Sequence, residues 1–330
     1  MTTISDITAT FLQQTAKPLI VVVGPTASGK TDFSVNLALA LGGGGLGVGR
    51  GKWKNVEIIN ADSRQLYKYL DIGTAKIRAE EAKGILHHLI DVLDPKEEVT
   101  ASWFKDQAQK LIKEIHNRGN IPMLVGGSML YISAVIDDLT FPSASDPKVR
   151  KLLSEKYDQD DGVSLFKELQ KIDPETASAF HRNNKPYVLR AMEIAFVEKK
   201  PPSKMKHAGK SPYDLLMFGM EWERAELHER INKRTKQLFE MGWIDEVKKL
   251  LEKGFTAKDP AMKSHGYREI AEAISNGKLE MPARPMPGSN GKNEKYMKEL
   301  IESISAQGRQ YAKRQMTWWR HDPRIQWVHP

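Results

Sequence analysis

The chain has 330 residues, of which 40% are hydrophobic and 28% charged, as in a folded globular protein with one large domain or two unequal ones. It contains no cysteine, which excludes disulfides, thiolate zinc sites and cysteine-held iron–sulfur clusters. The formal charge of +8 suits a partner rich in phosphate, although many enzymes of small molecules are equally basic.

Residues 1–17 are polar and are expected to be frayed. The first apolar stretch is too short to span a membrane and lacks the basic flank of a signal peptide. We therefore expect a cytosolic protein without a membrane partner.

A strand predicted over residues 19–23 runs directly into the sequence GPTASGKT, and a helix is predicted over 32–41. The spacing G-x-x-x-x-G-K-[ST] is that of a phosphate-binding loop, whose glycines let successive N–H groups face one anion. A lysine then adds charge, and a threonine hydroxyl can hold a magnesium ion. With these flanks, a glycine-rich turn that binds nothing is the weaker interpretation. The candidate residues are Gly24, Pro25, Thr26, Ala27, Ser28, Gly29, Lys30 and Thr31.

Further strands are predicted over 56–59 and 121–125, with a helix over 101–118 between them. This alternation predicts an α/β fold, a parallel sheet with helices on both faces. Ligands bind at the carboxyl ends of such strands. The phosphate loop, Asp62 and residues 126–128 all follow strands, so they are expected at one edge.

Asp62 has three open interpretations, as a magnesium ligand, a general base or the cap of a turn. The pair His87-His88, with Asp91, has the composition of a metal site. Adjacent residues of a strand point to opposite faces, however, so a structural or positioning role is favoured.

Strand signals fade after about residue 142, and short amphipathic helices follow. We interpret 142–212 as a helical insertion domain, and 18–141 with 213–330 as the core domain. A strand is predicted over 215–220, and long helices over 223–241 and 294–316. The low-complexity segments 42–51 and 281–293 are interpreted as surface loops.

Two cationic stretches near the C-terminal side each allow two interpretations. Arg230 and Arg234 share a helical face, which is either solvated or supplies a diphosphate ligand. Residues 310–320 interleave cations with aromatic rings, a composition that suits RNA. The same stretch has a helical spacing of core-type residues, so one face can pack while another binds. The packing positions are Tyr311, Ala312, Gln315 and Trp319.

Several segments, in order over nearly the whole chain, together resemble the tRNA dimethylallyltransferases, isopentenyl transferases of the MiaA type. They are GPTASGKT (24–31), NADSRQLYKYLDIGTAK (60–76), HHLIDVLDP (87–95), LVGGSMLY (124–131), residues 143–150, RAMEIA (190–195), GYREI (266–270) and QYAKRQMTWWR (310–320).

The resemblance implies a P-loop core, a helical insertion that clamps the anticodon stem-loop of tRNA, and magnesium as cofactor. It implies transfer of a dimethylallyl group from dimethylallyl diphosphate to N6 of adenosine 37, beside the anticodon. Asp62 would be the general base, and Thr26 would contact the reacting amine and the diphosphate. Lys30, with Arg230 or Arg234, would neutralise the leaving diphosphate. A monomer is expected.

By the same resemblance, the target base leaves its stack and enters a pocket beside Asp62. Ser128 and Pro186-Tyr187 depart from the family pattern, which often has threonine and a basic pair there; Tyr187 could stack instead. The residues that match tRNA contacts are Asp62, Ser63, Arg64, Gln65, Ser128, Arg150, Pro186, Tyr187, Val188, Leu189, Arg190, Lys263, Ser264, His265, Gly266, Tyr267 and Arg268.

Three alternatives stay open on the sequence. An adenylate isopentenyltransferase would prenylate free nucleotides and would not need the basic insertion or the segments 263–268 and 310–320. A P-loop small-molecule kinase would move a phosphoryl group from ATP. A non-catalytic RNA-binding protein would tolerate the loss of Asp62 and Lys30.

Overall fold

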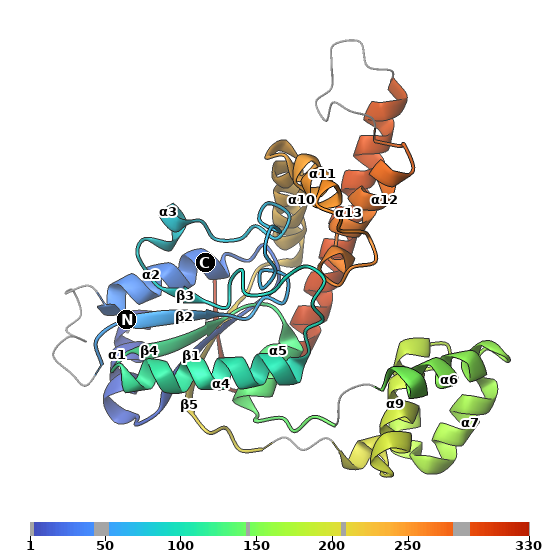
Figure 1. Cartoon of the computed structure of the whole chain (residues 1–330). Helices are drawn as coiled ribbons and strands as arrows, with labels where there is room; N and C mark the ends of the chain where they lie inside the picture. Colours follow the sequence, from blue (N-terminus) through green and yellow to red (C-terminus); the bar gives the residue numbers. More distant parts are fainter. Residues whose placement is uncertain (1–2, 43–52, 143–145, 206–208, 280–290, 330) are drawn as a thin grey trace. The chain divides into compact units, whose positions relative to one another are not determined.

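The computed structural model describes residues 3–42, 53–142, 146–205, 209–279 and 291–329. The chain divides into two compact units, Met1–Ile132 with Pro212–Pro330, and Ser133–Ser211 (Figure 1). The second unit thus begins earlier than the predicted residue 142, because helix α5 (Met129–Ile136) continues across the division. The low-complexity segments 42–51 and 281–293 fall mostly outside the described residues.

The first unit is built on a six-stranded sheet of order β3-β2-β4-β1-β5-β6, and all neighbouring strands run parallel. The predicted α/β class is therefore confirmed. In this register Val22 lies opposite both Val125 and Phe218, so β1, β4 and β5 end at a similar level. The strands are β1 (Pro18–Val23), β2 (Val56–Asn60), β3 (His87–His88), β4 (Ile121–Val125), β5 (Asp214–Met220) and β6 (Ile325–Val328).

Helices cover both faces of the sheet, as apolar parallel strands require. Helix α2 (Lys30–Gly42) lies on one face and α4 (Ala101–Asn117) on the other (Figure 1). Side chains of β1, β2 and β4 join α2 in a buried cluster that includes Val22, Ile58 and Val35. On α4, Phe104, Ala108, Ile112 and Ile115 are buried, one stripe of an amphipathic helix.

The N-terminus differs from the expected frayed segment, because residues 4–14 form helix α1 (Ile4–Gln14). Thr3 and Asp6 form a capping box, in which the Thr3 hydroxyl accepts a hydrogen bond from the Asp6 N–H at 3.1 Å. Leu12 is buried in the same cluster as α2. Capping and this apolar contact hold the helix despite its polar composition.

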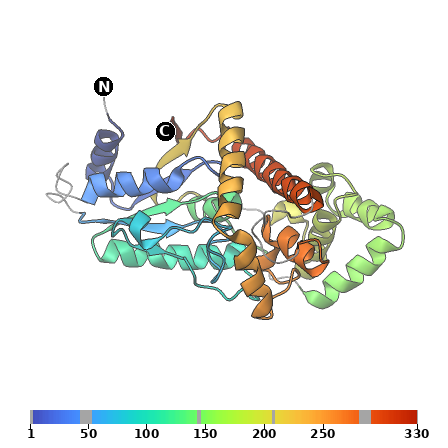
Figure 2. The ribbon, with the colours of Figure 1, turned by 90° about the horizontal axis from the view of Figure 1, so that it is seen from above.

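The remaining helices of the first unit gather near the carboxyl ends of the strands (Figures 1 and 2). Figure 2 shows α13 crossing α10, and Leu227, Ile231 and Ala312 form the buried contact between them. These elements are α10 (Arg224–Glu240), α11 (Trp243–Glu252), η3 (Ala261–Lys263), α12 (Tyr267–Ser275) and α13 (Gly291–Trp319). The short helix α3 (Ala79–Ala82) lies apart from them, near α2 (Figure 1).

The second unit is helical and has a core of its own, in which Leu165, Leu169 and Val188 are fully buried. Aspartates cap two of its helices: Asp146 begins α6, and Asp173 begins α8. Its elements are α6 (Pro147–Asp158), α7 (Val163–Ile172), α8 (Pro174–Ser178), α9 (Lys185–Glu198) and η2 (Pro202–Lys204).

Candidate functional site

The phosphate-binding loop curls between β1 and α2 as the spacing predicts. Ala27 and Gly29 have φ of +62° and +85°, so the chain turns sharply before α2 begins at Lys30. The Lys30 Nζ donates to the Pro25 carbonyl at 2.7 Å, which closes the loop. The N–H groups at the start of α2 have no partner within the helix, which makes this end an anion site.

Cationic side chains converge on this loop from α10. Burial and, to a smaller extent, the nearby Arg234 lower the pKa of Lys30 to about 8, although the Asp62 carboxylate opposes both effects. Burial likewise lowers the pKa of Arg234, which the Asp62 carboxylate opposes and the Arg230 charge reinforces. Because lysine and arginine outnumber the carboxylate, the site carries a net positive charge and suits a diphosphate.

The two arginines of α10 take different positions. Arg230 donates from Nε to the Ala27 carbonyl at 3.0 Å, so it touches the loop itself. Arg234 interacts electrostatically with Lys30 and Asp62. Arg230 is exposed but contacts the loop, and Arg234 is half-buried near Lys30 and Asp62, so the structure places both at the predicted site.

Asp62 follows β2 in a turn, and the two oxygens of its carboxylate differ in their hydrogen bonding. Its Oδ1 accepts the Arg64 N–H at 2.8 Å, and its own N–H donates to Asn60 Oδ1 at 3.1 Å. The turn-cap interpretation therefore holds for one oxygen. Among the residues that the structure describes, none donates a hydrogen bond to Oδ2. That oxygen is available to a substrate proton.

Ser128 joins the loop after β4 to the loop after β2. Its Oγ accepts the Ser63 N–H at 2.9 Å, and its N–H donates to the Ala61 carbonyl at 3.1 Å. Gly126 permits this approach, because a Cβ there would lie 2.2 Å from the Ala61 oxygen. Ser128 is buried and serves to hold the segment that carries Asp62.

Helix α13 ties the phosphate loop to the loop after β4 through the predicted 310–320 stretch. Gln315 accepts the Thr26 N–H at 2.9 Å and donates to the Gly127 carbonyl at 2.8 Å. The Tyr311 hydroxyl also donates to Gly127, at 3.1 Å, and burial raises its pKa to about 12. Ala312, Gln315 and Trp319 are buried, as the packing interpretation predicts. The cations of this stretch, Lys313, Arg314 and Arg320, are exposed on other faces.

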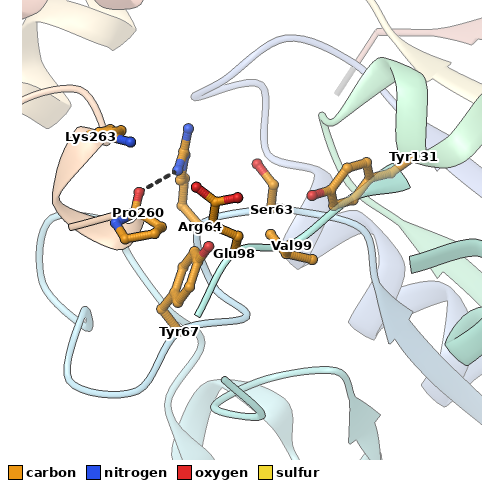
Figure 3. A pocket seen from close by; sticks show the side chains of 8 residues that line it. All are labelled: Ser63, Arg64, Tyr67, Glu98, Val99, Tyr131, Pro260 and Lys263. Atoms are coloured by element: carbon orange, nitrogen blue, oxygen red, sulfur yellow. Dashed lines mark hydrogen bonds between the residues drawn. The ribbon is translucent and has the colours of Figure 1, made fainter. Parts of the chain in front are cut away.

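A cavity of about 230 Å³ opens beside the Asp62 turn (Figure 3). Tyr131 points its hydroxyl toward Ser63, and Arg64 donates to the Pro260 carbonyl at 3.4 Å (Figure 3). Polar groups and aromatic rings share the wall, as in pockets that accept a nucleobase. The lining residues are Ser63, Arg64, Tyr67, Glu98, Val99, Tyr131, Pro260 and Lys263.

The segment 263–268 has alternating exposure. Lys263, His265 and Arg268 are exposed, whereas Ser264, Gly266 and Tyr267 are buried. The Tyr267 hydroxyl donates to Glu246, so this side chain holds α12 against α11 and is not available to a partner. Gln65, also matched to tRNA contacts, donates to the Thr74 carbonyl at 3.2 Å.

The second unit contributes its own cationic pair. Arg150 and Arg190 both donate to Glu193 Oε2, at 3.3 and 3.0 Å, and Glu193 is almost fully buried. Tyr187 is exposed, with its ring 5.6 Å from that of Phe180. The neighbouring residues that were matched to tRNA contacts differ in exposure. Pro186 is exposed, but Val188 and Leu189 are buried in the core of this unit.

The histidine pair has structural contacts. His88 Nε2 lies 2.6 Å from Glu57 Oε2, and His87 Nδ1 lies 2.9 Å from the Ile85 oxygen. Burial alone would raise the pKa of Glu57, but hydrogen bonds from Arg118, Asn120 and His88 outweigh it and lower the pKa to about 2. Within the described ranges no group of three or more His, Asp or Glu side chains could hold a metal.

Sequence reasoning missed Trp222, whose indole N–H donates to the Ser28 carbonyl of the phosphate loop at 3.0 Å. Trp222 stands just beyond the carboxyl end of β5, the neighbour of β1, and this position was the available signal. It also missed Glu98, which lies in no matched segment, and it gave Tyr131 no role although this residue ends the matched segment 124–131.

Fold and site together define a P-loop-type α/β protein with a cationic site whose charge suits a phosphorylated ligand. The sequence model of one family, described as IPP transferase, matches residues 65–322. The chain belongs to the IPP transferase family, whose members are prenyl-transferring enzymes.

Individual relatives agree with this assignment. A tRNA dimethylallyltransferase of Carboxydothermus hydrogenoformans is 40% identical, over 94% of this chain and 92% of that protein. The solved tRNA isopentenylpyrophosphate transferase of Bacillus halodurans is 37% identical with a TM-score of 0.63, covering 95% of this chain and 90% of the other. A solved eukaryotic dimethylallyltransferase acting on tRNA has a TM-score of 0.72 at 27% identity, covering 92% and 70%.

Proposed function

We propose that this protein transfers a dimethylallyl group from dimethylallyl diphosphate to N6 of adenosine 37 in tRNA. The observation that carries the proposal is the position of Asp62, within electrostatic range of Lys30 and Arg234 beside the phosphate loop. A base and a diphosphate site next to one another are what alkylation of an amine by a diphosphate ester requires.

In the proposed reaction the bond between the allylic carbon and the diphosphate oxygen breaks, and the oxygen keeps the electron pair. The N6 atom of adenine forms a bond to that carbon. The growing charge of the leaving diphosphate is met by the loop N–H groups, Lys30 and the arginines of α10. Lys30, with a pKa of about 8, is mostly protonated near neutral pH and can serve this role.

Asp62 is proposed as the general base that takes the N6 proton through its Oδ2. Its Oδ1 is engaged by the Arg64 N–H, which fixes the plane of the carboxylate. Gln315 accepts a hydrogen bond from the Thr26 N–H and so holds the backbone from which the Thr26 side chain extends. We propose that this hydroxyl contacts the reacting amine and the diphosphate.

Magnesium is proposed as the cofactor. The Thr31 side chain is exposed in the first turn of α2, and its hydroxyl makes no hydrogen bond with any residue that the structure describes. Such an oxygen, with water and diphosphate oxygens, matches the ligands that Mg²⁺ prefers, so the residues fit. The bound ion would neutralise charge on the leaving group.

The RNA is proposed to reach the site with its target base flipped out of the stack. The cavity beside Ser63 and Arg64 is large enough for one nucleobase. The exposed cations Lys263 and Arg268, and the pair Arg150 and Arg190 of the second unit, are proposed to contact phosphates of the anticodon stem-loop.

No helix among the described residues is long and apolar enough to cross a membrane. We propose a monomer acting in the cytoplasm.

The decisive experiment offers the protein dimethylallyl diphosphate and Mg²⁺ with either unmodified tRNA or AMP, and analyses nucleosides by mass spectrometry. We expect prenylated adenosine only from tRNA. Product only from AMP would support an adenylate isopentenyltransferase and overturn the proposal. Phosphoryl transfer from ATP without prenylation would identify a kinase. Absence of any product with tRNA binding intact would leave an RNA-binding protein.

A further inference from the structure

Trp222 stands behind the phosphate loop, between the end of β5 and the start of α10. Its indole N–H donates to the Ser28 carbonyl at 3.0 Å. The guanidinium of Arg230 stacks on the Trp222 ring, and its Cζ lies 4.0 Å from the ring centroid. Stacking at this distance is a cation–π contact, strongest on tryptophan.

Arg230 and the Trp222 ring both contact the phosphate loop. The Arg230 Nε donates to the Ala27 carbonyl at 3.0 Å, so Arg230 and Trp222 bind the carbonyls of two successive loop residues. Its Nη2 lies 3.9 Å from where a Cβ on Gly29 would stand, which puts the other side of the guanidinium against the loop. Without the Trp222 ring, this long side chain would have more rotamers open to it.

Arg230 and Trp222 contact a part of the loop whose backbone conformation needs support from other residues. Ala27 has φ of +62°, a left-handed conformation that alanine rarely adopts without outside support. In a trans peptide the carbonyl and the following N–H point in opposite directions. Holding the Ser28 carbonyl against Trp222 therefore turns the Gly29 N–H away from the indole.

We propose that Trp222 is a positioning residue of the donor site. It keeps the Arg230 guanidinium in place for the diphosphate and fixes the orientation of the Ser28–Gly29 peptide. The inference rests on the proposed function only in taking the bound anion to be the diphosphate of the prenyl donor.

The test measures binding of inorganic diphosphate with Mg²⁺ by calorimetry, for Trp222→Leu, Trp222→Phe, Arg230→Ala and the double variant Trp222→Leu/Arg230→Ala. We expect Trp222→Leu to weaken binding roughly tenfold, and Trp222→Phe, which keeps a ring but loses the N–H, roughly threefold. In the Arg230→Ala background the same Leu substitution should cost only about threefold, because part of its effect passes through Arg230. Trp103→Leu, in the half-buried first turn of α4, is the matched control.

Steady-state kinetics provide a second readout. The KM for dimethylallyl diphosphate should rise with the dissociation constant, while the KM for tRNA stays within about twofold. General unfolding would not separate the two substrates in this way. If Trp222→Leu lacks a cooperative thermal transition, Trp222→Phe decides.

Unchanged diphosphate affinity in Trp222→Phe and Trp222→Leu, or fully additive losses in the double variant, would overturn the inference. A wild-type protein that binds diphosphate but prenylates no RNA would overturn the proposed function alone, and the titrations would still decide the role of Trp222. A wild-type protein that binds no diphosphate would overturn both.

Discussion

At the scale of single residues, Asp62 holds a turn and is our proposed general base, and one substitution can separate these two roles. Asp62→Asn keeps an Oδ1 that accepts the Arg64 N–H, so the turn is retained while the base is lost. We expect turnover to fall about a hundredfold or more, with tRNA affinity nearly unchanged. Single-turnover assays and binding titrations measure the two effects. Asp106→Asn, exposed on α4, is the control, and near-normal turnover in Asp62→Asn would contradict the base assignment.

Lys30 is expected to make donor binding pH-dependent. Its pKa of about 8 means that its charge is present below this pH and is lost as the pH rises through it. Affinity for diphosphate should therefore weaken above about pH 8. In Lys30→Arg the guanidinium stays charged, so this part of the profile should flatten. Calorimetry from pH 6.5 to 9.5 compares the two proteins, and identical profiles would show that Lys30 does not titrate in the site.

At the scale of elements, the attachment of α13 to the phosphate loop is the most testable contact. Gln315→Ala would leave the Thr26 N–H without its acceptor, whereas the Gly127 carbonyl would keep the Tyr311 hydroxyl as a donor. A buried unsatisfied group costs about 1–3 kcal/mol, so we expect a loss of roughly 1–3 kcal/mol in unfolding free energy. Denaturant unfolding measures it, with exposed Gln310→Ala on the same helix as the control. A loss equal to that of the control would show that the bonds contribute nothing.

Elements with strong periodic patterns were predictable, and those held by distant contacts were not. The apolar runs of β1, β2 and β4 and the stripe of α4 lie close to their predicted bounds. The four-residue strand β6 was missed because it is formed through pairing with β5, roughly a hundred residues earlier. The interpretation of residues 1–17 failed because apolar residues within a polar segment pack on α2.

In the candidate site, too, residues marked by a local pattern were predictable and those placed by distant contacts were not. The phosphate loop and Asp62 were found because their positions follow strands, a rule that topology enforces. The role of Gln315 depends on α13 ending over the loop, and no local pattern encodes that. For Trp222 the one signal was its position just beyond β5. Buried members of matched segments, such as Tyr267 and Val188, could not be told from exposed ones before the packing was known.

At the scale of the whole molecule, the charge of +8 should make RNA binding sensitive to salt. Each cation that neutralises a phosphate releases a counterion, so we expect tRNA affinity to fall at least ~10-fold between about 50 and 200 mM salt. Fluorescence anisotropy measures it. Arg268→Ala should reduce the slope, by about one charge, whereas Lys110→Ala on α4 should not. Affinity that is constant with salt would contradict an interface built on phosphate contacts.

The contact between Thr26 and Gln315 also has a consequence for biosynthesis. The two residues are 289 positions apart, yet one hydrogen bond joins them at the mouth of the phosphate loop. Chains are made from the N-terminus, so the loop leaves the ribosome long before the helix that completes it. During most of translation the nascent chain therefore carries a phosphate loop without its finished shape. We therefore expect competence to bind the donor only after residues 310–320 have emerged and α13 has packed on the loop.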